Sequence, residues 1–130
     1  MLFRSALLFA LFFVVGCSDF PDENFKEYLL VKYDKNFDDQ LSIDEKADVA
    51  YIRVSGKNIH SLKGIEQFKN LKGLVCSDNQ LTSLDISNNT KIEYLDIRMN
   101  GLLETLYVWR GFKWDKWFME KDDNTKIVEK

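Results

Sequence analysis

The feature that most constrains this chain is an aliphatic ladder that recurs about every 21 residues in its second half. Three copies align at steps of 22 and 21 residues: Val49-x-x-Ile52-x-Val54, Leu71-x-x-Leu74-x-Cys76-x-x-Asn79 and Ile92-x-x-Leu95-x-Ile97-x-x-Asn100. Alternate apolar residues of a short strand point to one side, and an asparagine side chain can bond the backbone where the chain turns. Repeats of this length stack into a solenoid with a continuous core.

The ladder also predicts how far the solenoid extends. Leu81-x-x-Leu84-x-Ile86-x-x-Asn89 supplies the opposite side of the coil, and a further half-turn follows at Leu102/Leu103, Leu106 and Val108. This gives about 2.5 turns over residues 51–110. A solenoid this short needs covers at its open ends.

The C-terminal segment is rich in aromatic residues. We expect residues 111–130 to form an aromatic cap and tail; alternatively, the rings form a platform for a sugar or peptide. The aromatic residues concerned are Trp109, Phe112, Trp114, Trp117 and Phe118.

The stretch Q-L-T-S-L-D-I-S-N-N-T-K-I-E-Y-L-D-I (Gln80 to Ile97) and the turn S-G-K-N-I-H-S-L-K-G-I (Ser55 to Ile65) resemble the leucine-rich-repeat family. The resemblance is to the 21–22-residue, internalin-like repeats of bacterial surface proteins, and it spans roughly residues 22–110. It implies a function in protein binding. The fold alone does not assign a ligand.

A calcium loop is predicted ahead of the repeats. Asp34 to Glu45 reads D-K-N-F-D-D-Q-L-S-I-D-E, with side-chain oxygens at positions 1, 3, 5, 9 and 12 of an EF-hand loop and a backbone carbonyl at position 7. The predicted Ca²⁺ ligands are Asp34, Asn36, Asp38, Gln40, Ser42 and Glu45. Asp39 replaces the usual glycine at position 6, so we expect weak to moderate affinity, near 10⁻⁴–10⁻³ M. The alternative is an acidic helix-turn-helix that holds no ion.

The residues around this loop predict two helices. Phe25, Leu29 and Tyr33 are spaced for one helical face, and the capping box S-I-D-E at Ser42 starts a second helix through about Ala50. Residues 25–50 would cover the N-terminal end of the solenoid. The predicted fold class is α+β: a short leucine-rich-repeat solenoid preceded by an EF-hand-like helix-loop-helix.

The first residues predict export and lipidation. Arg4 precedes a short apolar run, so residues 1–16 read as a signal peptide. Val14-Val15-Gly16-Cys17 resembles the lipobox of bacterial lipoproteins, which implies a diacylglyceryl group on Cys17 and an anchor in the outer membrane or at the cell surface. Residues 17–24 would be an acidic tether. The alternative is an ordinary secretory signal with an incidental cysteine.

Charge and residue types narrow the function. Residues 19–48 hold ten acids and four lysines, whereas residues 51–130 hold eleven acids and thirteen Lys/Arg without a basic run, so nucleic acid is not an expected partner. Cys76 occupies an inward ladder position and reads as a core residue. The solitary histidine, His60, has no catalytic partner in the pattern, and we predict that the chain is not an enzyme.

Outward positions of the ladder strands predict a binding face. Stacking the repeats aligns Tyr51 with Gly73 and Tyr94, and the next columns follow two residues on. The predicted binding face is Tyr51, Arg53, Val75, Ser77, Tyr94, Asp96 and Arg98. We expect a lipid-anchored, calcium-stabilised module that binds a protein, with a glycan as second candidate. The alternative is a structural envelope lipoprotein, or a subunit of a larger assembly, with no ligand of its own.

Overall fold

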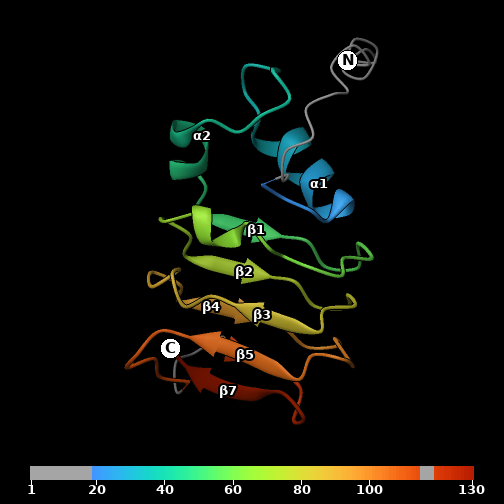
Figure 1. Cartoon of the computed structure of the whole chain (residues 1–130), viewed down its shortest axis with the longest axis vertical. Helices are drawn as coiled ribbons and strands as arrows, with labels where there is room; N and C mark the ends of the chain where they lie inside the picture. The colour runs from blue at the N-terminus through green and yellow to red at the C-terminus, as the bar shows by residue number, and fades with distance from the viewer. Residues whose placement is uncertain (1–18, 115–118) are drawn as a thin grey trace.

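The computed structural model describes residues 19–114 and 119–130, which wind into a coil with one parallel sheet on each side. Sheet A has the order β1 (Tyr51–Arg53), β2 (Gly73–Val75), β4 (Tyr94–Asp96) and β6 (Met119–Glu120). Sheet B has the order β3 (Ser83–Asp85), β5 (Thr105–Val108) and β7 (Lys126–Glu129). In the first turn, the short 3₁₀ helix η2 (Ile65–Gln67) occurs in place of a sheet B strand. The result is a β-solenoid of about three turns (Figure 1).

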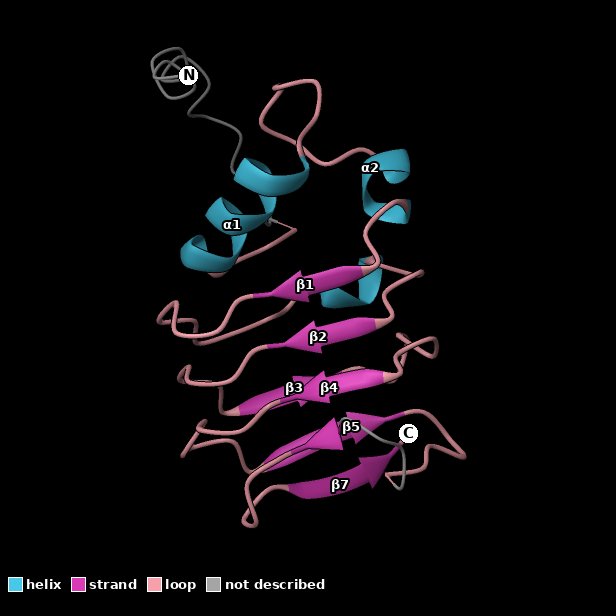
Figure 2. Cartoon of the chain, turned by 180° about the vertical axis from the view of Figure 1, so that it is seen from behind, coloured by secondary structure: helices cyan, strands magenta, loops and turns pink. Residues whose placement is uncertain are grey.

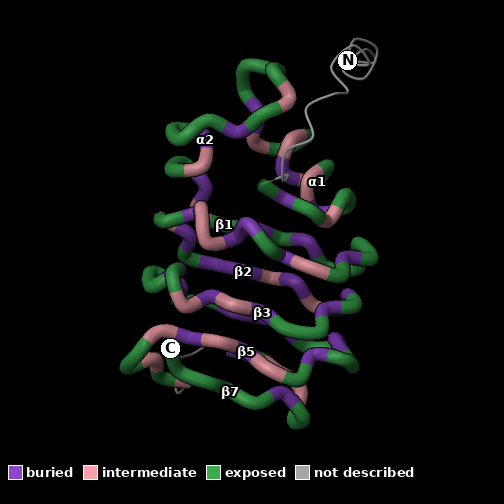
Figure 3. Tube along the Cα trace, viewed as in Figure 1, coloured by how far each residue is buried: buried purple, intermediate pink, exposed green. Residues whose placement is uncertain are grey.

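The core is the aliphatic ladder itself. The register pairs Ile52 with Leu74 and Leu74 with Leu95 on sheet A, and these three side chains are fully buried. On sheet B, Leu84 pairs with Leu106, and both side chains are buried. Buried and exposed segments alternate along the coil because successive residues of a strand face opposite sides (Figure 3). The predicted solenoid and the inward position of its ladder residues are confirmed; of the two leucines that the last half-turn left open, Leu103 is buried and Leu102 is 65% exposed.

Two helices lie over the N-terminal end of the coil, beyond β1 (Figures 1 and 2). Helix α1 (Glu23–Tyr33) starts at Asp22, whose carboxylate caps the helix by accepting from the N–H groups of Asn24 and Phe25. The other oxygen of Asp22 accepts from the N–H groups of His60, at 2.8 Å, and Ser61, at 3.2 Å. One side chain therefore begins the helix and joins it to the first repeat.

Helix α2 (Ile43–Ala47) starts at the predicted capping box, in which Ser42 and Glu45 bond each other's backbone N–H groups. It ends at Ala47, three residues before the expected boundary. The physical reason is that the Ala50 carbonyl is hydrogen-bonded to the next repeat, where it accepts from the N–H groups of Lys72 and Gly73.

The segment predicted as an acidic tether is packed against the domain from Asp19 onward. Phe20 is 5% exposed, and its ring lies 5.7 Å from Phe25 and 5.8 Å from Phe68. The Lys46 ammonium holds this segment from outside by bonding Asp19 at 3.2 Å. The free energy gained by burying the Phe20 ring exceeds the preference of the neighbouring acidic side chains for water. Residues 19–24 are therefore part of the folded domain and differ from the expected acidic tether. Cys17 and the predicted signal peptide lie outside the described residues.

The C-terminal segment differs from the expected cap because it continues the coil. β6 extends sheet A beside β4, and β7 extends sheet B beside β5. Trp109, Phe112 and Trp114 are partly buried against the core, with the first two rings edge to face at 4.9 Å. Trp117 and Phe118 lie outside the described residues. Within the part of the chain that the structure describes, no helix has both the length and the apolar character needed to cross a membrane.

Candidate functional site

The outward residues of sheet A form the columns that the repeat spacing predicts. The register places Tyr51 beside Gly73 and Gly73 beside Tyr94, while Arg53, Val75 and Asp96 form the next column. Tyr51 and Tyr94 are 48% and 39% exposed. We call this outward surface, from Tyr51 to Arg98, the sheet A face. Its role as a binding face remains a prediction.

Gly73 shapes the centre of this face. A Cβ atom added to Gly73 would lie 2.5 Å from Cδ1 of Tyr51, so the tyrosine ring occupies the space that a side chain would need. The Arg53 guanidinium lies 5.3 Å from the centroid of the same ring. Tyr51 therefore packs on the Gly73 backbone and lies near a cation, and these contacts order an exposed aromatic side chain before any partner binds.

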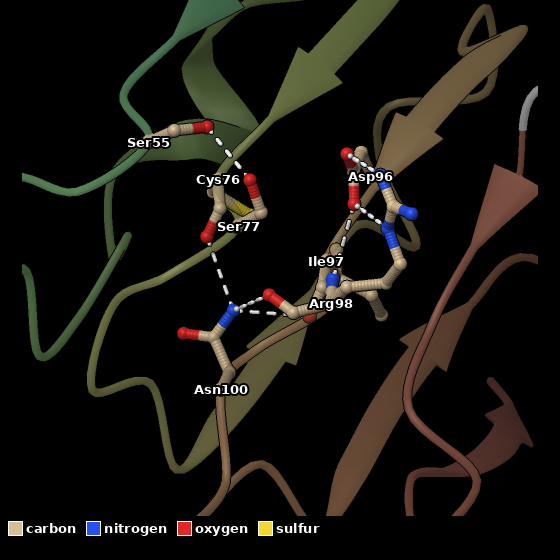
Figure 4. Close-up of polar contacts among 7 residues, drawn as sticks. All are labelled: Ser55, Cys76, Ser77, Asp96, Ile97, Arg98 and Asn100. Carbon is tan, nitrogen blue, oxygen red and sulfur yellow. Dashed lines mark hydrogen bonds and ion pairs between the residues drawn. The ribbon is translucent and has the colours of Figure 1, made fainter.

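Polar side chains complete the face at its other end. Arg98 donates to both carboxylate oxygens of Asp96, at 2.9 Å from Nε and 2.8 Å from the terminal nitrogen (Figure 4). The hydrogen bonds from Arg98 hold the pKa of the Asp96 carboxyl below its usual value, so the pair is ionised at neutral pH. The hydroxyls of Ser55 and Ser77 lie 2.8 Å apart, which links two neighbouring repeats across the surface.

Buried asparagines support the face from inside. Asn100 donates to the carbonyls of Cys76, at 3.1 Å, and Ile97, at 3.0 Å (Figure 4). Asn79 bonds the repeat before it in the same way, with its amide 2.8 Å from the Val54 carbonyl. We call this pair, Asn79 and Asn100, the asparagine ladder. Cys76 is fully buried behind it, which confirms the predicted core position, and burial raises the pKa of its thiol.

Two tyrosines of α1, Tyr28 and Tyr33, complete the open edge of β1; the sequence pattern marked only Tyr33, as part of the predicted helical face. The Tyr33 hydroxyl donates to the Tyr51 carbonyl at 2.5 Å, and the Arg53 N–H donates to the Tyr28 hydroxyl at 3.1 Å. These phenols satisfy backbone groups that an edge strand would otherwise leave unpaired. Burial, together with the bond to Tyr28, raises the pKa of Tyr33 above its ordinary value, so this phenol stays protonated. The periodic pattern placed Tyr33 on the apolar face of the helix, but it predicted neither the hydrogen bond of the Tyr33 hydroxyl nor the role of Tyr28.

The predicted calcium loop has the turn that its motif requires. Asp39, at position 6, adopts φ 62°, and its N–H donates to Asp34 at 2.9 Å. Asp34 and Glu45, the first and last predicted ligands, are buried. The N–H groups of Ser42 and Lys35 donate to Glu45 and lower the pKa of its carboxyl.

The loop's oxygen donors otherwise bond the loop itself. Asn36 and Asp38 are exposed and bond each other at 3.1 Å, and Asp38 accepts from the N–H of Gln40. Among residues 19–114 and 119–130, no three His, Cys, Asp or Glu side chains converge to hold a metal ion. The donor set has the hard oxygens that Ca²⁺ prefers, while its geometry is that of a loop folded on its own hydrogen bonds.

Two parallel sheets, an inward leucine ladder and buried asparagines at the turns define the fold as a leucine-rich-repeat solenoid. Comparison with known proteins gives the same class. No family model matches the sequence. The chain is similar to internalin J of Listeria monocytogenes serotype 4b (strain F2365), with 31% identity over 71 residues, or 55% of this chain and 8% of that protein.

A solved structure shows the same architecture. The crystal structure of an internalin (inlF) from Listeria monocytogenes matches with a TM-score of 0.57 and 24% identity, over 83% of this chain and 32% of that chain. The protein is thus internalin-like in its repeats and its fold. It spans only a small part of either relative's length.

Proposed function

We propose that this protein is a lipid-anchored, calcium-stabilised binding module that engages a protein partner at the bacterial envelope or cell surface. The observation that carries the proposal is the sheet A face, where Tyr51 and Tyr94 are exposed yet held in register by the repeats. Tyrosine and arginine are the residues that most often dominate binding energy at interfaces. The similarity to internalin J supports a surface or secreted location and a protein ligand.

The face can be tested directly. The double variant Tyr51→Ala/Tyr94→Ala is expected to bind a partner isolated from envelope or host material at least tenfold more weakly, because both exposed rings lose their contact area. The matched control is Ser83→Ala/Lys126→Ala, two exposed positions on sheet B. Affinity is measured by surface plasmon resonance, with melting curves to verify folding. Equal affinity of the two double variants would remove the sheet A face from the proposal.

In this proposal, bound calcium increases the thermal stability of the protein. Asp34, Asn36, Asp38, Ser42 and Glu45 would bind the ion through side-chain oxygens and Gln40 through its carbonyl. Neutralising part of the acidic excess of residues 19–48 would then hold the helices over β1. The left-handed turn at Asp39 supports this assignment, because the motif places its sharpest turn at that position.

The calcium proposal predicts a shift in thermal stability. At 10 mM Ca²⁺ and a Kd of about 10⁻⁴–10⁻³ M, linkage adds about 1.4–2.7 kcal/mol, which raises the Tm by roughly 5–15 °C over the same protein in EDTA. Glu45→Gln is expected to abolish the shift while keeping the capping box, since glutamine also fits that motif. The control Glu27→Gln, on the exposed side of α1, should retain it. Identical melts in calcium and EDTA would reduce the loop to a connector.

The lipid anchor is proposed from the lipobox-like sequence at Cys17. Metabolic labelling with a fatty-acid probe should tag the wild-type protein and leave Cys17→Ser unlabelled. Protease treatment of intact cells should then show whether the domain faces outward. The second candidate function, a structural envelope lipoprotein, predicts that the sheet A face variants change no interaction at all.

A further inference from the structure

A groove lies between α1 and the turn that follows β1, at the N-terminal end of the sheet A face. This open groove has a volume of about 730 Å³, and its lining includes Tyr28, Val31, Lys32, Lys57 and Asn58. The amide of Asn24 donates to the Asn58 carbonyl at 2.9 Å and so fixes the helix to the turn. The groove joins the sheet A face directly, because the Tyr28 hydroxyl also accepts from the Arg53 N–H.

Three cationic side chains lie within 6 Å of the tyrosine ring centroids in this region. The ammonium groups of Lys32 and Lys57 lie 5.9 and 5.7 Å from the centroid of the Tyr28 ring, one from the helix and one from the turn. Arg53 lies 5.3 Å from the centroid of Tyr51. We call Lys32, Arg53 and Lys57 the basic cluster.

The basic cluster is exposed, and none of its three side chains forms an ion pair within residues 19–114 and 119–130. Elsewhere in the same range, Lys35, Lys46, Arg98 and Lys130 each have a carboxylate partner. Glu27 lines the groove, and the Asp78 carboxylate lies 3.5 Å from where a Cβ atom on the groove residue Gly56 would be, so the local charge of the groove with Arg53 is still positive by one. A ring face positions a cation without using its N–H donors, so those donors stay available to a ligand.

The same geometry argues against a sugar platform. Stacking a sugar requires an open aromatic face. The ammonium groups of two lysines lie near the Tyr28 ring, and the Tyr51 ring packs on Gly73 with the Arg53 guanidinium nearby. Charged donors beside partly apolar lining, with Val31 72% exposed, suit carboxylates on an aliphatic chain. Glutamate and aspartate side chains of a polypeptide have this chemistry.

We propose that the basic cluster binds an acidic segment of the partner protein, with its carboxylates at Lys32, Arg53 and Lys57. This inference rests on the proposed function of the sheet A face and assigns the charge of the partner at one end of it. The rest of the partner would continue along the columns toward Tyr94 and Arg98. Binding at this end is therefore sensitive to salt, because solvent ions screen the charges.

The experiment uses residues 17–130, the expected mature chain, and a hexaglutamate peptide as the probe. Binding of the peptide is measured by the NMR shifts of the tyrosine rings and by calorimetry. The variant Lys32→Gln/Lys57→Gln is expected to bind the peptide at least tenfold more weakly than wild type, and added salt should weaken wild-type binding. The matched control Lys63→Gln/Lys69→Gln removes the same charge from exposed positions outside the groove and should leave binding unchanged. Hexaglutamine should bind no variant.

Several outcomes would overturn the inference. If the two double lysine variants lose peptide affinity equally, the peptide is attracted by the net charge of the protein and not by a specific site. Tighter binding of a hyaluronan hexasaccharide than of hexaglutamate would assign the groove to an anionic glycan instead. If hexaglutamate fails to bind while Tyr51→Ala/Tyr94→Ala still loses the partner, the acidic-segment inference falls and the proposed function stands. If hexaglutamate binds but those tyrosine variants keep the partner, the proposed function falls instead.

Discussion

Replacing Asn79 with alanine is expected to destabilise the protein by at least about 3 kcal/mol, which is far more than the loss of an exposed polar side chain costs. The Asn79 amide donates to the carbonyls of Val54, Cys76 and Ser77, and its oxygen accepts from the N–H groups of Lys57 and Ile59. The side chain is 5% exposed, so water cannot take over all of these bonds. Several buried backbone groups would be left unpaired at once, and each costs about 1–3 kcal/mol.

The matched control is Asn88→Ala. Asn88 has the same chemistry but is more accessible to solvent, and its loss should change stability by no more than about 0.5 kcal/mol. Urea unfolding followed by circular dichroism measures both variants. Similar midpoints for Asn79→Ala and Asn88→Ala would show that the asparagine ladder is not what ties the repeats together.

Replacing Gly64 with alanine is expected to cost about 3 kcal/mol and to release the N-terminal segment. Gly64 has φ 104°, a region that side chains rarely adopt. A Cβ there would also lie 2.4 Å from the Asp19 carbonyl oxygen and 2.4 Å from Cδ1 of Phe20. The Phe20 ring, held between Phe25 and Phe68, would have to leave its place in the core.

Gly101→Ala is the control for this change, because no heavy atom lies within 4 Å of the Cβ it would add. Thermal melts should separate the two variants clearly. Limited proteolysis provides a second readout, since cleavage near Asp19 should accelerate in Gly64→Ala alone. A Gly64→Ala protein as stable and as protease-resistant as Gly101→Ala would contradict the packing described for residues 19 and 20.

The repeats were predictable because their signal is local and periodic. Leu74, Leu95 and the asparagine ladder recur at fixed spacing, and a slip of one residue would turn each strand's apolar side chains outward. The structure pairs the strands in the register that the spacing predicts. The sheet A columns followed from the same register, although their function could not be read from spacing.

The last turn of the coil was missed because it breaks the pattern. Met119 pairs with Leu95 but lies 24 residues later, and an aromatic stretch interrupts the alignment. The polar contacts of the turn also change residue type. The Asp122 carboxylate accepts from the Asn100 N–H at 3.1 Å, and the Thr125 hydroxyl donates to the Leu103 carbonyl at 2.9 Å. Neither side chain belongs to the L-x-x-L-x-L-x-x-N signature.

The repeat pattern also could not predict contacts between segments that lie far apart in the sequence. Phe20 packs on Phe68, Asp22 binds the turn at His60, and Tyr28 meets Arg53, all across 25 residues or more. Each depends on how α1 lies over β1, which no local periodicity encodes. The predicted calcium ligands show the opposite case: the loop motif was visible in the sequence, whereas the oxygens of Asp34 and Asp38 accept from N–H groups of the loop itself, and calcium binding stays a proposal.

The two ends of the coil are protected to very different degrees. At β1, phenol groups and a helix seal the edge, whereas all four residues of β7 are exposed and no strand in the described ranges pairs with its outer side. Each turn of a solenoid contacts only the turns next to it. Because the β7 end is less protected than the β1 end, we expect unfolding to begin at β7. A mechanical load applied to β7 would peel the described turns away one after another, and the turn that contains Tyr51 would open last.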